Sequence, residues 1–68
     1  MRLEFEKGLF GPDWKYKAYS NGYVGPDGLF IRRATKSNRG FYALFHKGKF
    51  ISQHIKLEIA QHKAEELL

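Results

Sequence analysis

Apolar and polar residues alternate along two short segments in the first part of the chain. Residues 2–6 and residues 14–18 both follow this pattern, with Lys15 and Lys17 on one side of the second segment. A period of two residues is typical of half-buried β-strands. We therefore predict two short strands, the second of which ends in a tight turn at Asn21-Gly22.

The middle of the chain predicts a hairpin and a further return strand. Residues 29–34 and 41–46 are rich in branched and aromatic side chains, and the polar segment 35–40 separates them. This composition favours two strands joined by a loop. Lys47-Gly48 predicts another turn, into a strand over residues 49–52, because glycine tolerates the positive φ of two-residue turns.

The spacing of apolar residues changes near the end of the chain, where it becomes helical. Polar residues such as Glu58 and Gln61 are mainly on the opposite side, and Ser52 and Lys56 are two imperfect candidates for the helix boundary. An isolated helix of this length would be marginal in water, so we expect its apolar stripe to pack on one face of a sheet and leave the other face open. The predicted stripe contains Leu57, Ile59, Ala60, Ala64, Leu67 and Leu68.

These elements predict an α+β fold, with a small antiparallel sheet of three to five strands packed on one C-terminal amphipathic helix. No linker or low-complexity stretch divides the chain, so we expect a single domain over residues 1–68. The only repetition is Gly-Pro-Asp, at residues 11–13 and 25–27. Proline presets φ for a type I turn, so the repetition predicts two turns.

Composition indicates which residues fill the core and in which cellular compartment the protein is expected. A chain of 68 residues buries about 60% of its unfolded surface, so six Phe, four Tyr and one Trp should supply much of the core. We expect Trp14 to lie there. The absence of cysteine excludes disulfides and thiolate metal sites and favours a cytoplasmic location. No apolar run is long enough for a membrane helix or a signal peptide, and we predict no membrane partner.

Positive charge is concentrated in the middle of the chain. The formal net charge is +5, and between Trp14 and Lys56 the only acidic residue is Asp27. Such a field attracts polyanions and anionic protein surfaces. The basic residues of this segment are Lys15, Lys17, Arg32, Arg33, Lys36, Arg39, Lys47, Lys49 and Lys56.

Basic side chains interleaved with aromatic rings suit nucleic acid, because cations neutralise phosphates and rings stack on unpaired bases. One of Arg32 and Arg33 must point outward in either strand register, but the sequence does not decide which. In the alternative reading, the cations are ordinary solvated residues and all the aromatics are core. The predicted nucleic-acid-binding residues are Lys15, Lys17, Arg32, Arg33, Lys36, Arg39, Tyr42, Lys47 and Lys49.

No arrangement of residues predicts catalysis, and no metal or cofactor is expected. The three histidines lack a recognised ligand spacing, and the adjacent Glu65 and Glu66 point to different sides of a helix. Residues 48–50 (GKF) lack the glycine and the Ser or Thr of a phosphate-binding loop. We therefore predict that the protein is not an enzyme.

The order of elements resembles the three-stranded-sheet DNA-binding domains of phage integrase N-termini and the AP2-type domains. The segments that carry the resemblance are GLFIRR at 28–33, GFYALF at 40–45, KGK at 47–49 and Ala60-x-x-x-Ala64, within residues 28–68. In those families the sheet enters the major groove, and basic side chains on its strands reach bases or phosphates. The resemblance would implicate Arg32, Arg33, Lys36, Arg39, Tyr42 and Lys49.

A second resemblance implies a different ligand. Residues 11–14 and 60–68 resemble the loop and last helix of double-stranded-RNA-binding domains. Such domains recognise duplex RNA by its shape and its phosphates.

The predicted function is that of a small, basic, non-catalytic nucleic-acid-binding module that uses a sheet face and the 35–40 loop on phosphates, with DNA favoured over RNA. The alternative is a small protein-binding inhibitor or regulatory subunit of phage type, which would dock on an acidic surface of a nucleic-acid-handling protein. An exposed edge strand, for which residues 1–7 are the candidate, would also allow pairing with a partner or a second copy.

Overall fold

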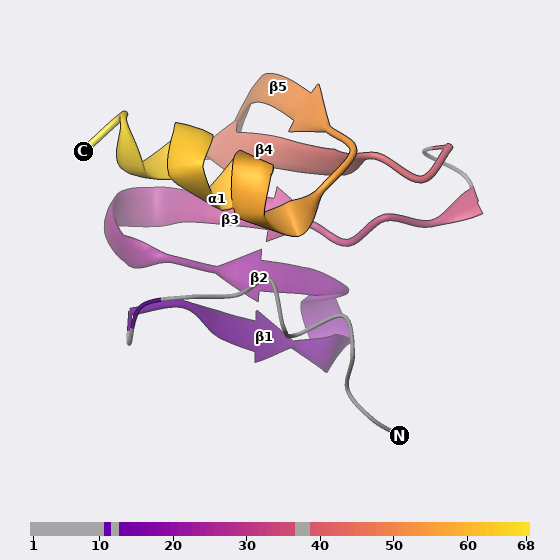
Figure 1. The fold of residues 1–68 in the computed structure, drawn as a ribbon. Coiled ribbons are helices and arrows are strands. Elements are labelled where there is room, and N and C mark those ends of the chain that lie inside the picture. The colour runs from indigo at the N-terminus through magenta and orange to yellow at the C-terminus, as the bar shows by residue number, and fades with distance from the viewer. Residues whose placement is uncertain (1–10, 12, 37–38) are drawn as a thin grey trace.

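Five antiparallel strands follow one another in chain order, and one helix crosses a face of the resulting sheet (Figure 1). This is a computed structural model, and it describes residues 11, 13–36 and 39–68. The predicted α+β class is confirmed, while the strand expected at residues 2–6 lies outside the described residues. The elements are β1 (Lys15–Lys17), β2 (Gly22–Val24), β3 (Leu29–Arg32), β4 (Tyr42–His46), β5 (Lys49–His54) and α1 (Leu57–Glu65).

A tight turn joins β1 to β2. A single 3-10 turn over Ala18–Ser20 leads to Asn21, which adopts the left-handed conformation with φ 56°, and its amide donates to the carbonyl of Ala18 at 3.0 Å. Asparagine tolerates this conformation better than most residues, so the turn predicted here is confirmed. Gly22 is already the first residue of β2, a strand that the sequence analysis did not predict.

The second Gly-Pro-Asp forms the turn between β2 and β3. Pro26–Gly28 makes another 3-10 turn, and the amide of Gly25 donates to the carbonyl of Leu29 at 2.9 Å. The predicted turn is confirmed, but Asp27 has a φ of 56°, which differs from the negative φ of a type I turn. The first copy includes Pro12, which lies outside the described residues.

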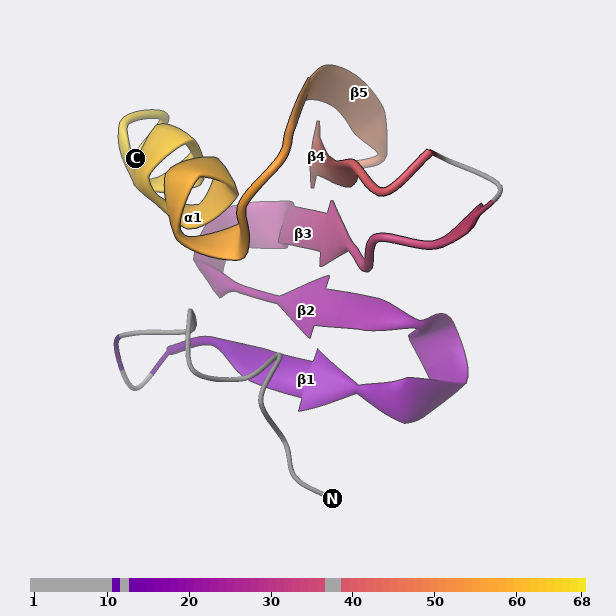
Figure 2. The ribbon, with the colours of Figure 1, turned by 45° about the vertical axis from the view of Figure 1, so that its right-hand side comes forward.

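The hairpin between β4 and β5 uses the two-residue turn predicted from the sequence. Both Lys47 and Gly48 have positive φ, which matches the right-handed twist of the flanking strands. A bulge follows: Leu44 pairs with Ser52, whereas the next residue, Phe45, pairs with Phe50. The extra residue, Ile51, bends β5, which curls away from the plane of the other strands in Figure 2.

Two predicted strand ends were wrong by two residues. The strand predicted over 29–34 ends at Arg32, and the strand predicted over 49–52 continues to His54. The amide of Arg33 still donates to the carbonyl of Asn21 at 3.0 Å, but the chain then leaves the sheet for the 33–41 connection. Strand ends depend on cross-strand partners, which local composition does not reveal.

The helix α1 packs against β3, β4 and β5, as expected for a stripe that must be buried. Gln61 was predicted to be mainly on the polar side, and this was wrong: it is fully buried. It belongs to the same i, i+3, i+4, i+7 stripe as Leu57, Ala60 and Ala64. The other three members of the predicted stripe, Ile59, Leu67 and Leu68, are exposed.

The core lies on the face of the sheet that α1 covers, and Tyr23 is one of its largest fully buried side chains. The ring of Tyr23 lies 5.0 Å from that of Tyr16 and 6.5 Å from that of Tyr42, centroid to centroid. Trp14 is buried, as predicted, and its ring lies over Gly25, where an added Cβ would come within 2.6 Å of it. In the described part of the chain, no helix is both long and apolar enough to span a membrane.

Candidate functional site

The face on which each strand side chain lies follows from the buried set. Tyr16, Tyr23 and Ile31 pair with one another across β1, β2 and β3 and belong to the core or pack against it. Because side chains alternate along a strand, their neighbours point to the opposite side, which α1 does not cover. We call this side the open face. Its strand residues are Lys15, Lys17, Gly22, Val24, Phe30, Arg32, Ala43, Phe45, Phe50 and Gln53.

The strand register arranges the open face in two rows that cross all five strands. Each row consists of residues that are direct cross-strand partners, whose side chains are neighbours on one face. The aromatic row contains Lys15, Val24, Phe30, Phe45 and Phe50. The basic row contains Lys17, Gly22, Arg32, Ala43 and Gln53.

The aromatic row places three phenylalanine rings side by side on β3, β4 and β5. The ring centroids of Phe30 and Phe45 are 6.2 Å apart, and those of Phe45 and Phe50 are 5.7 Å apart, with interplanar angles of 47° and 72°. Phe50 is 53% exposed, and the row continues on β2 with Val24, which is 38% exposed. A row of apolar side chains on a small protein's surface marks a candidate interaction site.

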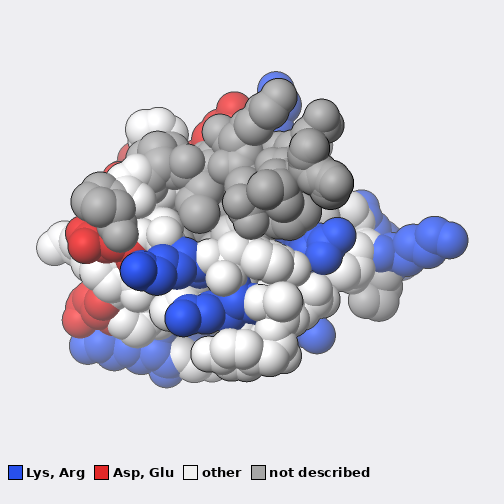
Figure 3. Space-filling model, turned by 90° about the horizontal axis from the view of Figure 1, so that it is seen from below, with Lys and Arg blue, Asp and Glu red and all other residues white. Residues whose placement is uncertain are grey.

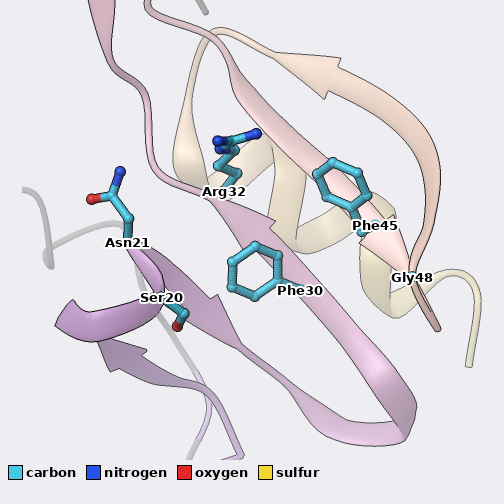
Figure 4. A pocket seen from close by; sticks show the side chains of 6 residues that line it. All are labelled: Ser20, Asn21, Phe30, Arg32, Phe45 and Gly48. Carbon is cyan, nitrogen blue, oxygen red and sulfur yellow. The ribbon is translucent and has the colours of Figure 1, made fainter. Parts of the chain in front are cut away.

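A hollow of about 350 Å³ lies between the two rows. Figure 4 shows the rings of Phe30 and Phe45 beside the guanidinium of Arg32, with Asn21 on the turn between β1 and β2. An added Cβ at Gly22 would lie only 2.4 Å from Cζ of Phe30, so the glycine allows the ring to lie over β2. The residues that line the hollow are Ser20, Asn21, Phe30, Arg32, Phe45 and Gly48.

Three cations lie on the strands of the open face: Lys15, Lys17 and Arg32. None of the described residues of this face is acidic. The view from below, which looks onto the β1 edge of the sheet, shows basic side chains across the molecule and acidic ones in the left half (Figure 3). The charge of this face therefore complements an anionic ligand.

Arg33 and Tyr42, two of the predicted binding residues, lie away from the open face. Arg33 follows the last residue of β3, and its Nη1 donates to the hydroxyl of Tyr16 at 3.1 Å. Tyr42 packs against the core on the side of α1. The structure thus answers the question of parity between Arg32 and Arg33: Arg32 is on the open face.

Two other predicted residues belong to the β4–β5 hairpin. Lys47 occupies the turn, with Nζ 3.9 Å from Oδ1 of Asp27, and both side chains are largely exposed. Lys49 pairs with His46, which places it on the same side of the sheet as α1. Neither side chain belongs to the two rows of the open face.

Lys36 and Arg39 are exposed on the connection between β3 and β4. The amide of Arg39 donates to the carbonyl of Lys36 at 3.1 Å, and the amide of Gly40 donates to that of Thr35 at 2.9 Å. These bonds join the described residues on either side of positions 37–38, between the end of β3 and the start of β4. Both cations lie outside the strands that form the open face.

The histidines are distributed over separate elements. Nε2 of His46 lies 3.4 Å from Oδ2 of Asp27, and Nε2 of His54 lies 2.8 Å from Oγ of Ser52. His62 is on α1. Within residues 11, 13–36 and 39–68 there is no group of three or more His, Cys, Asp or Glu residues that could hold a metal ion.

Comparisons with known proteins identify no relative of this chain. No family model, curated protein or solved structure matches the chain. The residues of the open face are therefore the basis for assigning a function.

The sequence analysis did not single out Phe30, Phe45 or Phe50, and it expected the aromatic residues to supply much of the core. The run Leu-Phe-Ile at 29–31 is apolar throughout, so it does not reveal which of its members faces outward. The sequence did indicate that Phe30 and Arg32 lie on the same face, because strand residues two positions apart share a face. Because Ile31 between them is buried, that shared face is the open one.

Proposed function

We propose that this protein is a non-catalytic nucleic-acid-binding module whose open face and 35–40 loop contact phosphates. The observation that supports the proposal most is the placement of Lys15, Lys17 and Arg32 on a face whose described strand residues include no acid. Lysine and arginine at such positions neutralise phosphates and release counterions, which is the main source of affinity for nucleic acids.

The loop cations add to the same surface. Lys36 and Arg39 are exposed just beyond the end of β3, the strand that carries Arg32. The resemblance to sheet-based DNA-binding domains points to the same use of strand and loop cations. We expect the protein to act in the cytoplasm, where a chain without cysteine is at no disadvantage.

The proposal predicts binding that weakens steeply with salt. Three phosphate contacts correspond to a slope of about −2 in log affinity against log salt for a single strand, or roughly a 20-fold loss between about 50 and about 200 mM salt. Fluorescence anisotropy with duplex DNA, single-stranded DNA and duplex RNA at two salt concentrations measures this slope. If none of the three binds at low salt, the proposal is wrong.

A matched pair of variants separates the open face from net charge. Lys17→Glu with Arg32→Glu changes the basic row, whereas Lys49→Glu with Lys56→Glu changes exposed cations outside it. Each pair lowers the formal net charge from +5 to +1, two units per substitution. We expect the first pair to lose binding at least tenfold more than the second, because only it removes cations from the proposed contact surface.

Binding to a protein partner is the second candidate function, and exposed isoleucines at the β5 edge of the sheet favour it. Ile51, within the edge strand β5, is 37% exposed, and Ile55, which follows that strand, is 72% exposed. An edge strand with apolar neighbours can pair with another chain. Binding at an interface with an apolar centre would change little over the same range of salt.

A further inference from the structure

We propose that the aromatic row is a stacking platform for unpaired bases, so that the protein prefers single-stranded nucleic acid to a duplex. This inference rests on the proposed function and names its substrate class. Charge alone explains attraction to any nucleic acid, but it does not explain why Phe30, Phe45 and Phe50 lie in one line outside the core.

Aromatic side chains on this face contribute less to the core than they could. Stability is marginal in a chain of 68 residues, so burying a ring would be a large gain. Yet Phe50 is about half exposed, and Phe30 and Phe45 are only partly buried. Base stacking uses ring faces that solvent reaches, and it tolerates any sequence because every base has a π-face.

Ring spacing selects unpaired bases. Neighbouring centroids in the row are 6.2 and 5.7 Å apart, whereas stacked bases in a duplex strand are only about 3.4 Å apart. Adjacent bases can therefore reach adjacent rings only if the strand is unstacked and its bases are splayed. A duplex keeps its base faces covered by the neighbouring pairs.

Polar groups lie where a stacked strand would need them. The guanidinium of Arg32 lines the same hollow as the rings of Phe30 and Phe45, and Ser20 and Asn21 line it from the β1–β2 turn (Figure 4). A base on a ring would thus leave its phosphate near a cation and its polar edge near hydroxyl and amide groups. The hollow, about 350 Å³, is within the range of ligand sites.

The charge of the open face argues against a second copy of this chain as the occupant. Two such faces packed together would bring Lys15, Lys17 and Arg32 of each copy against like charges, and the described residues of the face supply no acid to pair with them. Like charges in an interface cost several kcal/mol. A single strand of nucleic acid complements both rows, because its phosphates can pair with the cations and its exposed bases can stack on the rings.

The test compares a deoxythymidine or uridine oligonucleotide of about 12 nucleotides with a blunt DNA duplex of equal length. In low salt we expect the single strands to bind at least tenfold more tightly than the duplex. An oligonucleotide that carries 2-aminopurine should change its fluorescence on binding, because stacking on a ring alters the emission of this base. Preference for DNA or RNA follows from the two single-stranded probes.

The decisive variant removes ring faces and keeps apolar volume. Phe45→Leu with Phe50→Leu should weaken single-strand binding about 5- to 150-fold for each stacking contact that is lost, and leave duplex binding within about twofold. Tyr19→Leu is the matched control, since Tyr19 is an 88% exposed aromatic outside both rows. Circular dichroism checks that each variant is folded. Should the double variant unfold, Phe50→Leu alone gives the same comparison.

The outcomes separate this inference from the proposed function. Equal, salt-dependent affinity for single strands and duplex, unchanged in the Phe45→Leu, Phe50→Leu variant, would overturn the stacking inference and leave nucleic-acid binding intact. Failure of every probe to bind at low salt overturns both. Selective loss of single-strand binding in that variant, with Tyr19→Leu unaffected, supports both.

Discussion

The two faces of the sheet carry opposite chemistry although the same strands build them. In β3, Leu29 and Ile31 are almost completely buried under α1, while Phe30 is partly exposed and Arg32 is exposed. The covered face supplies the contacts that hold the fold together. The open face keeps cations and rings accessible, so alternation along one strand separates the core residues from the residues of the candidate site.

This division has a physical limit in so small a protein. A single helix covers β3, β4 and β5, and Trp14 covers the region of β2 by lying over Gly25. So short a chain leaves a large share of its surface in contact with solvent, and among the described residues no helix covers the opposite face of the sheet. Exposed side chains on that face should therefore contribute less to the core than those beneath α1.

The largest expected effect is the loss of a core side chain. Leu44→Ala removes a fully buried residue between β3 and β5, and we expect the free energy of unfolding to fall by about 2–5 kcal/mol. Phe45→Leu, at the next position but on the open face, should cost less than about 1.5 kcal/mol. Urea denaturation followed by circular dichroism measures both. Equal losses would mean that the two faces contribute equally to the free energy of unfolding.

A smaller effect is expected at Gly22 on the open face, which lies against the ring of Phe30. Gly22→Ala places a Cβ 2.4 Å from the ring of Phe30 and 2.6 Å from the carbonyl oxygen of Ile31, so both must shift, at about 1–3 kcal/mol. The double variant with Phe30→Leu should recover part of that loss, because it removes the ring from over β2. Thermal unfolding of the four proteins in this cycle gives the coupling, and strict additivity would contradict the proposed contact.

A link within the covered face should be weaker still. Nε1 of Trp14 donates to Oε2 of Glu65 at 3.1 Å, which ties the segment before β1 to the end of α1. Glu65→Ala removes the acceptor, so we expect a loss of about 1 kcal/mol in urea denaturation. Glu66→Ala is the control: its ion pair with Lys63 is exposed and should contribute little. Comparable losses in the two variants would argue against a role for the Trp14 bond.

The smallest effect distinguishes two adjacent arginines. Arg32→Gln should weaken binding of single-stranded DNA about fivefold near 0.1 M salt and make the salt slope shallower by about 0.7, the value for one phosphate contact. Arg33→Gln should leave both unchanged, because that side chain reaches Tyr16 on the other side of the sheet. Anisotropy titrations at several salt concentrations make the comparison. A larger loss in the Arg33 variant would reverse the assignment of faces.

The sequence predicted most of the elements because their signals are local. The two-residue turn at Lys47-Gly48, the turn at Asn21-Gly22 and the helix near the C-terminus depend on residues close together in the chain. It missed β2, whose three residues lie between two turn signals. A strand that short is specified by its neighbours in the sheet, which are not its neighbours in sequence.

The sequence by itself determined an α+β chain with a basic middle segment, and a residue such as Arg32 or Arg33 that must face outward. Only the tertiary structure decided which one, because the parity of a strand is set by the face that α1 buries. The same parity places Tyr42 on the core side, and it places Phe30, Phe45 and Phe50 in one row on the open face. Cross-strand register, which local patterns do not encode, created the candidate site.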